Sequence, residues 1–313
     1  MKKFAFAFLI LGIFYFYSNR NSHKPADGRV GDEIVQSSIN DKHKNRKAKP
    51  NLDANVGITQ TEDIPIPIIP IELTNGTKPP SKQIKPASDA TPLLTYVIDD
   101  GLAVIQGDII IGEVSQDTLL KSLSGNVNEP SLQIWPTTEI PYFIQPNLSS
   151  PDRVLQALAF FSGTNVHFVP YVDQEDAIVF EQGMGACKSY LGYIGGHQKI
   201  ILSNGCSPKE IAHEIMHSLG FLHEQNRTDR DSYVNVLWDN VDPKFRINFE
   251  KFSSAMMKVS GLTQFDFESL MIYPENMFSI NNHATMKPKL EGQSISPSHG
   301  LSAKDIERIN KTY

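Results

Sequence analysis

Three histidines and one glutamate lie close together in the segment His213 to His223, which reads HEIMHSLGFLH. His213 and His217 are four residues apart, so on a helix both imidazoles project from one face and can bind the same metal ion. Glu214 lies about 100° further round such a helix, where its carboxylate can take a proton from a water on the metal. His223 supplies a third nitrogen. Three protein ligands leave one position open, which is typical of a catalytic zinc site.

The residues around this segment predict a helix and a turn that bring the ligands together. Ser207 can cap a helix, Pro208 suits its first position, and Glu210 completes a capping box. Gly220 predicts the end of the helix, because glycine enters the left-handed conformation at no steric cost. The chain can then reverse and bring His223 to the metal from the other side. An isolated HExxH occurs by chance in ordinary helices, but the added glycine and third histidine make HExxHxxGxxH a specific zinc motif.

This long motif resembles that of the metzincins, and the residues after it resemble the astacin family of zinc endopeptidases. Glu224 follows the third histidine directly, and the run EQNRTDRDSYV, which ends at Val234, is typical of that family. The resemblance extends from about Ile134 to Tyr313. It implies an α+β fold, with a two-lobed metzincin-type catalytic domain, a twisted mixed sheet, a long zinc-binding helix and a mostly irregular C-terminal half.

The resemblance implies one Zn²⁺ per chain, bound by His213, His217 and His223, with Glu214 as the general base. The alternative is a catalytically silent zinc-fold module that serves binding or adhesion. Such a module should have lost Glu214 or a ligand, and this sequence has lost neither.

The expected partners are proteins or peptides that lie extended along an edge strand, and we expect a monomer. A net charge of −6 gives no support for nucleic-acid binding.

A second motif, SLMIY at residues 269–273, resembles the turn that astacins place under the zinc. Met271 matches the methionine beneath the metal, and Tyr273 matches a tyrosine within reach of it. A tyrosine hydroxyl can donate a hydrogen bond to the oxyanion of a tetrahedral intermediate. The segment differs from the family at Ile272, where a histidine is usual, and this difference concerns local packing more than catalysis.

The segment IQGD, residues 105–108, resembles the FxGD motif of astacin proregions, with isoleucine in place of phenylalanine. In the family its aspartate occupies the zinc before activation, which predicts Asp108 as a zinc ligand in the precursor. Gly-Asp is also a common turn pair, and residues 95–114 alternate β-branched runs with turns. The glycine is expected to let the backbone approach the cleft closely. Asp99 and Asp100 are alternatives, and the proregion is expected to follow the edge strand in the direction opposite to a substrate.

Glu224 helps to predict where the precursor is cleaved on activation. In the family, the new N-terminal amine becomes buried and pairs with the glutamate after the third histidine, usually through water. A charged carboxylate inside a protein needs such a partner. We therefore expect activating cleavage between Ser124 and Ser131.

The N-terminus predicts export. Two lysines precede an apolar run from Phe4 to Tyr17, which is short for a membrane span and suits a signal peptide. The residues that follow lack a small-x-small cleavage pattern, so a retained signal anchor stays open. After signal cleavage we expect a secreted protein without stable membrane association. The predicted parts are a signal peptide (1–18), a disordered spacer rich in Lys, Asn and Pro (19–90), an inhibitory proregion (91–125) and a catalytic domain (126–313).

The chain has two cysteines, Cys187 and Cys206. In an exported protein an even pair suggests a disulfide, whereas two buried thiols would suit a cytosolic protein. The family holds a disulfide in this region, and its common second disulfide is missing here.

Further elements are predicted from local patterns. Strands are expected at residues 139–145, 166–171 and 177–180, with two more between the cysteines. A capped helix is expected from Ser302 onward. An earlier helix starts at Ser150-Pro151-Asp152, and its apolar face is expected to comprise Val154, Leu155, Leu158, Ala159 and Phe161. Three further histidines fit no ligand spacing and are expected to be structural or exposed: His167, His197 and His283.

Overall fold

The computed structural model describes residues 93–114, 124–128, 131–254, 256–257 and 263–313. They all belong to one compact unit of the chain, Ile69–Tyr313. The predicted signal peptide and spacer lie outside the described residues. Among the described residues, no helix is long and apolar enough to cross a membrane.

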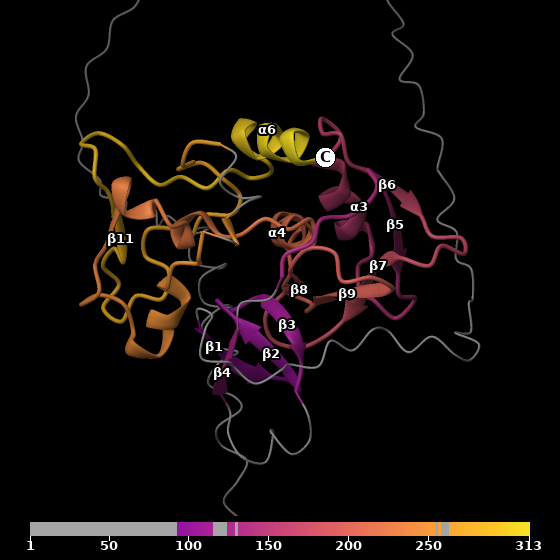
Figure 1. Cartoon of the computed structure of the whole chain (residues 1–313), viewed down its shortest axis with the longest axis horizontal. Helices are drawn as coiled ribbons and strands as arrows, with labels where there is room; N and C mark the ends of the chain where they lie inside the picture. Colours follow the sequence, from indigo (N-terminus) through magenta and orange to yellow (C-terminus); the bar gives the residue numbers. More distant parts are fainter. Residues whose placement is uncertain (1–92, 115–123, 129–130, 255, 258–262) are drawn as a thin grey trace, which may run out of the picture. The chain divides into compact units, whose positions relative to one another are not determined.

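A nine-stranded sheet carries the fold, in the strand order β4-β1-β2-β3-β8-β9-β7-β5-β6 (Figure 1). The pairs β5–β6, β5–β7 and β7–β9 are parallel, whereas β8 runs antiparallel to β9, so the expected mixed sheet is confirmed. The strands are β1 (Leu93–Asp99), β2 (Leu102–Ile105), β3 (Ile109–Glu113), β4 (Ser124–Asn128), β5 (Glu139–Ile144), β6 (His167–Pro170), β7 (Ala177–Gln182), β8 (Lys188–Tyr190) and β9 (His197–Leu202).

The four strands β1 to β4 come from the predicted proregion and its boundary, and they extend the sheet beyond β8. β3 pairs with β8 in parallel, with Ile109 opposite Ser189 and Ile110 opposite Tyr190. Its three consecutive isoleucines are all buried, as expected of a strand that is covered on both faces. β4 was not predicted. It pairs with β1 and crosses the proposed boundary between residues 125 and 126.

The helix of the zinc motif, α4 (Pro208–Ser218), begins and ends as its sequence predicts. The Ser207 hydroxyl accepts from the Glu210 amide, and the Glu210 carboxylate accepts from the Ser207 amide at 2.7 Å. Gly220, beyond the helix, has φ of 98°. The helix packs against β8, β9 and the preceding helix α3 (Asp152–Ala159), as Figure 1 shows.

The apolar face of α3 differs from the expected one at two positions, because Ala157 is buried and Ala159 is exposed. Val154, Ala157 and Phe161 are buried, following the i, i+3, i+7 spacing of a single face. Ala159 is exposed, because it lies about 200° around the helix from Ala157. The assignment of Ala159 to the buried face is therefore wrong.

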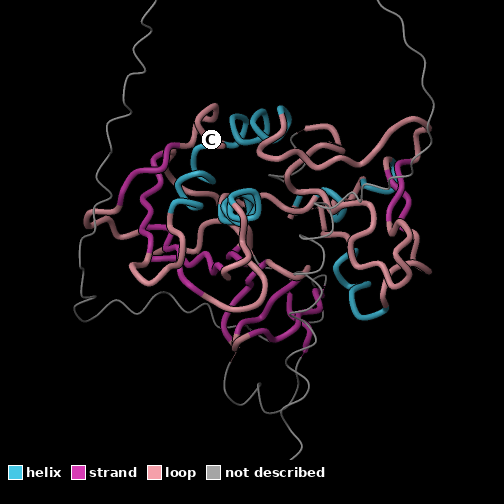
Figure 2. The backbone as a smooth tube through the Cα atoms, turned by 180° about the vertical axis from the view of Figure 1, so that it is seen from behind, coloured by secondary structure: helices cyan, strands magenta, loops and turns pink. Residues whose placement is uncertain are grey.

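The chain after α4 is mostly irregular, as expected (Figure 2). It has its own hydrophobic cluster, separate from the cluster around α4, and Ile272 is buried within it. This placement agrees with a packing role for Ile272. The short elements here are η2 (Glu224–Asn226), η3 (Arg230–Ser232), β10 (Val234–Val236), η4 (Pro243–Phe249), β11 (Met286–Pro288) and the capped final helix α6 (Ala303–Thr312).

A disulfide joins Cys187 and Cys206, as predicted. The bond connects the residue before β8 to the residue before the Ser207 cap of α4. The two cysteines are 19 residues apart. Closing a loop of this size raises the free energy of unfolding by about 3 kcal/mol, because it lowers the conformational entropy of the unfolded chain. The disulfide thus ties the start of β8 to the start of the helix that carries two of the predicted ligands.

Candidate zinc site

The three predicted zinc ligands converge. His213 and His217 project from one face of α4, and the turn at Gly220 brings His223 to them. The Nε2 atoms of His213 and His223 are 3.0 Å apart, and the three rings have centroid separations of 4.7 to 5.0 Å. The side chains of His217 and His223 are fully buried.

Each imidazole is oriented through its other nitrogen. His213 Nδ1 lies 3.0 Å from the carbonyl oxygen of Leu270, and His217 Nδ1 lies 2.8 Å from that of Phe221. A carbonyl oxygen can only accept, so both Nδ1 atoms carry the proton and both Nε2 lone pairs are left for a metal. His223 Nδ1 lies 3.0 Å from Gln106 Oε1 and donates to it.

Asp108 faces all three ligands. Its carboxylate oxygens lie 3.5 Å from His213 Nε2, 3.6 Å from His217 Nε2 and 3.3 Å from His223 Nε2. The turn before it has φ of 53° at Gln106 and 94° at Gly107. A Cβ at Gly107 would make only ordinary contacts, at 3.6 Å or more. Glycine is thus favoured here by its positive φ rather than by a lack of space for a side chain.

The donor set fits zinc. Zn–N distances of about 2.0–2.1 Å place tetrahedral ligands roughly 3.3 Å apart. The separations given above, 3.0 to 3.6 Å, lie around this value. Among the described residues, His217 Nε2 and Asp108 Oδ1 are buried without a hydrogen-bond partner. A cation between them would satisfy both atoms. Together with His213 and His223, these two residues form a cluster that could hold a metal ion.

The electrostatics of the cluster favour metal-binding forms of its members. Burial lowers the pKa of His217 to about 4 and also lowers the pKa of His223. Neutral imidazoles are the forms that bind metal. Burial raises the pKa of Asp108, but its interactions with the three histidines outweigh this and hold the pKa well below its usual range. The site therefore combines neutral nitrogen donors with one carboxylate.

Glu214 lies next to this cluster on α4. Its side chain is buried, and Oε2 has no hydrogen-bond partner among the residues that the structure describes. Burial, followed by the nearby charge of Asp108, raises its pKa well above the usual value, while Lys188 opposes the shift. A carboxylate with a raised pKa and a free oxygen is suited to accept a proton from a reacting water.

Tyr273 lies beside the ligand His223. Its ring centroid is 4.8 Å from that of His223, and its hydroxyl donates to the backbone oxygen of Gln106 at 2.6 Å. Burial raises its pKa well above the usual value, with Asp108 and Glu214 adding to the shift, so the hydroxyl stays protonated. It can therefore serve as a donor to an oxygen at the metal.

Met271 and Glu224 form the support of the site. Met271 is fully buried, and its carbonyl oxygen accepts from the Glu224 amide at 2.9 Å. The Glu224 carboxylate is also fully buried and pairs with Arg308 at 2.5 Å. It accepts from the Asp266 amide at 3.0 Å as well. In this uncleaved chain Arg308 supplies the charge opposite Glu224, and the expected pairing of Glu224 with a new N-terminal amine stays a prediction.

The alternatives to Asp108 lie elsewhere. Asp99 forms an ion pair with Lys188 of β8, and Asp100 is exposed in the turn between β1 and β2.

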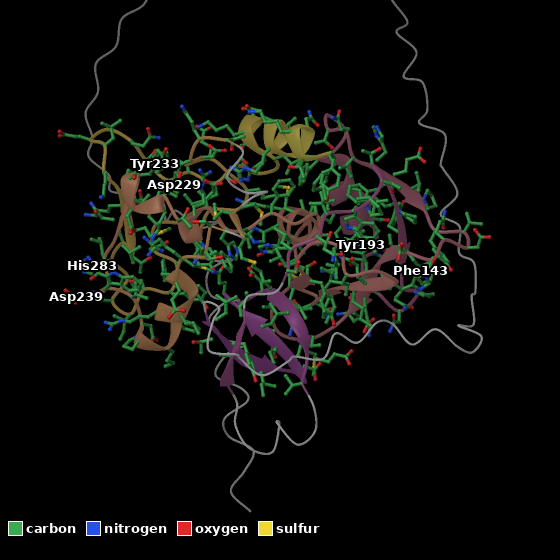
Figure 3. All side chains as sticks on the ribbon, in the orientation of Figure 1. Phe143, Tyr193, Asp229, Tyr233, Asp239 and His283 are labelled. Carbon is green, nitrogen blue, oxygen red and sulfur yellow. A yellow bond between two sulfur atoms is a disulfide. The ribbon has the colours of Figure 1, made fainter. Side chains whose placement is uncertain are left out.

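Of the three histidines that fit no ligand spacing, His167 and His283 are exposed, and Figure 3 shows His283 at the periphery of the C-terminal segment. The ring of His197 packs edge-on against Tyr171.

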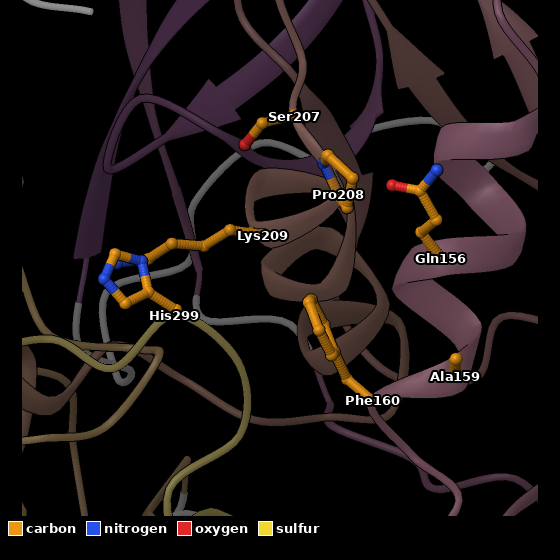
Figure 4. Close-up of a pocket in the computed structure, with 7 residues that line it drawn as sticks. All are labelled: Gln156, Ala159, Phe160, Ser207, Pro208, Lys209 and His299. Carbon is orange, nitrogen blue, oxygen red and sulfur yellow. The ribbon is translucent and has the colours of Figure 1, made fainter. Parts of the chain in front are cut away.

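A cavity of about 600 Å³ lies at the other end of α4, where α3 and residue 299 approach it (Figure 4). It is lined by Gln156, Ala159, Phe160, Ser207, Pro208, Lys209 and His299. None of the predicted ligands or catalytic residues is among them, so this cavity is separate from the candidate zinc site.

Sequence reasoning missed two residues near the site, of which Gln106 contacts it directly and Lys188 acts on it through its charge. Gln106 touches both His223 and Tyr273 but is the variable position of the FxGD pattern. Lys188 is buried beside the site and affects the charge of Glu214. The available signal was the position of Lys188, directly after Cys187 and at the start of a short strand. A lysine that is buried at such a position requires a charged partner.

Known proteins resemble this chain over the region that forms the site. Residues 127–313 match the model of Astacin, a family of peptidases. Zinc metalloproteinase nas-15 of Caenorhabditis elegans is 36% identical over 192 residues, which are 60% of this chain and 34% of that protein. Zinc metalloproteinase nas-14 of the same organism is 36% identical over 188 residues, 58% of this chain and 37% of that protein. The chain thus spans about a third of the length of these relatives.

A solved structure agrees with the sequence match. High choriolytic enzyme 1, a hatching enzyme zinc-protease from Oryzias latipes (Medaka fish), is 32% identical, with a TM-score of 0.50 over 57% of this chain and 92% of that one. The α+β metzincin fold is therefore confirmed, and the histidine cluster lies within the matched region. The chain belongs to the astacin family.

Proposed function

We propose that this chain is a zinc-dependent endopeptidase that is secreted as an inactive precursor and acts on proteins or peptides. The observation that carries the proposal is the convergence of three histidine Nε2 atoms beside a buried glutamate whose Oε2 has no hydrogen-bond partner among the described residues. The family to which the chain belongs is one of peptidases, and its relatives are named zinc metalloproteinases. A catalytically silent module would not need to keep Glu214.

The residues divide the work of peptide hydrolysis among them. His213, His217 and His223 would hold one Zn²⁺, which supplies Lewis acidity that polarises a carbonyl and makes a water more acidic. Glu214 takes a proton from the attacking water and later gives it to the leaving nitrogen. Tyr273 donates a hydrogen bond to the oxygen that gains negative charge.

Substitution of Glu214 tests this assignment. Glu214→Ala should keep the metal, because the three histidines are unchanged, and should lower casein hydrolysis by at least about 10²-fold, as expected for loss of a general base. Glu210→Ala on the same helix is the control, since Glu210 belongs to the cap and not to the site. Zinc content and hydrolysis are measured on the processed proteins. Hydrolysis by Glu214→Ala at the wild-type rate would exclude the mechanism.

The precursor is proposed to be latent because Asp108 fills the fourth metal position. A carboxylate is a good zinc ligand, and it would displace the water that Glu214 activates. The proposal is supported by the three Asp108–histidine distances and by the parallel pairing of β3 with β8. A substrate that runs antiparallel to β8 would follow the same edge in the opposite direction, so the proregion would occupy the substrate position without presenting a bond for cleavage.

Latency can be tested by the same chemical change at two aspartates. Asp108→Asn replaces a charged ligand by a neutral amide, and the precursor should activate itself at least several-fold faster than wild type. Asp100→Asn is the matched control, because Asp100 is exposed in a turn. Asp99 is not a suitable control, since it pairs with Lys188. The time course of precursor conversion on a gel is the measurement, and equal conversion rates for both variants would rule out Asp108 as the switch.

A further inference from the structure

One side of the last helix, α6, and the residue after it carry three polar groups that reach the supports of the zinc ligands. Asp305, Arg308 and Tyr313 are spaced i, i+3 and i+8, which places them on the same side of a helix. Asp305 and Arg308 are fully buried. Both backbone views place α6 beside α4 (Figure 1; Figure 2). We infer that α6 positions the metal ligands, an inference that rests on the zinc site proposed above.

The first contact leads to His213. Asp305 accepts from the Ser269 hydroxyl at 2.6 Å and from the Leu270 amide at 2.8 Å. The carbonyl oxygen of Leu270 in turn accepts from Nδ1 of His213 at 3.0 Å. Because Asp305 holds both the Ser269 side chain and the Leu270 backbone amide, it fixes the acceptor that sets the ring orientation of this ligand.

The second contact leads to His223. Arg308 pairs with Glu224, the residue directly after His223, and Thr263 accepts from Nε and Nη2 of Arg308 at 3.1 and 2.9 Å. The Glu224 amide donates to Met271, one residue beyond Leu270. The segments that carry His223 and Leu270 are therefore joined to each other and to the same helix.

The third contact leads to the end of α4. The hydroxyl of Tyr313 donates to the carbonyl oxygen of Leu219 at 2.7 Å, and Leu219 is the C-cap residue that follows His217 by two positions. The helix and the residue after it thus contact one supporting residue for each ligand, which is Leu270 for His213, Leu219 for His217 and Glu224 for His223. Asp305, Arg308 and Tyr313 touch neither the metal position nor a substrate, so they are positioning residues.

The carboxylate of Asp305 has two roles, which a pair of variants separates. It caps α6 by accepting from the Ser302 amide at 3.0 Å, and it holds Leu270. Asp305→Ala removes both interactions. Ser302→Ala removes the other half of the same capping box, in which Asp305 N donates to the serine hydroxyl, together with the bond from that hydroxyl to Asp266, and leaves Leu270 held. Asp305→Asn keeps an oxygen for Leu270 and offers an amide N–H to the Ser269 hydroxyl.

The measurement is the zinc dissociation constant of the full chain, obtained by competition with a chromophoric chelator. Removal of an outer-shell partner typically weakens metal binding by about 10- to 100-fold. We expect a loss near the lower end of this range for Asp305→Ala, and less than about threefold for Ser302→Ala and Asp305→Asn. The Co²⁺-loaded protein should show an altered visible spectrum only in Asp305→Ala. Far-UV circular dichroism of the metal-free proteins verifies that each variant is folded.

Arg308→Lys tests the second contact and covers the case in which Asp305→Ala does not fold. Lysine keeps a positive charge near Glu224 but cannot reproduce the guanidinium geometry, so we expect zinc to bind several-fold more weakly. Equal zinc affinity of wild type, Asp305→Ala and Arg308→Lys would overturn the inference while leaving the proposed function intact. An equal loss in Asp305→Ala and Ser302→Ala would overturn it too, because helix capping would then explain both. A wild-type chain that binds no zinc would overturn the proposed function and this inference together.

Discussion

In the proposed mechanism Tyr273 donates to a substrate oxygen, whereas in this structure its hydroxyl has a different partner. Its hydroxyl donates to the backbone oxygen of Gln106, while the Gln106 side chain accepts from His223. One proregion residue thus engages both the oxyanion donor and a metal ligand. In the proposed activation, removal of the proregion would release this hydroxyl to meet a substrate oxygen, and His223 Nδ1 would need another acceptor.

Replacing Tyr273 by phenylalanine isolates the hydroxyl. The ring packs on His223, so Tyr273→Phe should keep the fold of the site. Loss of one oxyanion donor typically lowers kcat by about 10²- to 10³-fold. We expect that loss in kcat, with little change in KM, for a processed enzyme acting on a peptide substrate. Unchanged turnover would remove this role from Tyr273.

At the residue scale, the ligand set could be predicted because its information is local. The spacing of His213, His217 and His223 is contained in eleven residues, and the structure brings them together. The outer partners could not be predicted in the same way. Arg308 and Gln106 reach Glu224 and His223 from opposite ends of the described chain, and only the tertiary fold makes them neighbours.

At the scale of elements, β8 lies between β3 of the predicted proregion and β9 of the predicted catalytic domain. Its outer side pairs with β3, and the disulfide holds its start. Lys188 lies on this strand with only 1% of its side chain exposed, and its partner is Asp99 at the end of β1. A buried ammonium group requires such a partner, so this pair should help to hold the proregion in place.

An exchange of charges tests this contact. Asp99→Ala should loosen the proregion, because Lys188 is left buried without its carboxylate, and the precursor should convert several-fold faster. Lys188→Asp combined with Asp99→Lys restores opposite charges and should recover part of the latency. Limited proteolysis of the precursors provides the measurement. If Asp99→Ala converts at the wild-type rate, or the double exchange recovers nothing, the pair does not contribute.

Local signals also decided which elements could be predicted. Short local motifs, Ser207 to Glu210 and Ser302 to Asp305, form the N-terminal caps of α4 and α6, and both helices begin there. β4, β10 and β11 were missed, because they are short and depend on pairing with distant strands. The parallel contact of β3 with β8 is of the same kind, and the sequence alone supported it only through the resemblance to astacin proregions.

At the scale of the whole molecule, the proposed maturation would remove strands from the nine-stranded sheet. The expected cleavage between Ser124 and Ser131 includes β4, which pairs with β1, and the family match begins at residue 127. Because Arg308 already neutralises Glu224, a new N-terminal amine is not required for that purpose. The position of the mature N-terminus stays a prediction.

Dependence on zinc tests the central claim most directly. The processed enzyme is dialysed against a chelator, its zinc content is measured, and casein hydrolysis is followed before and after zinc is added back. Because the three histidines of the described cluster are the ligands that remain once Asp108 has gone, we predict that activity disappears with the metal and returns at about one zinc per chain. Full hydrolysis by a protein shown to contain no zinc would contradict the account.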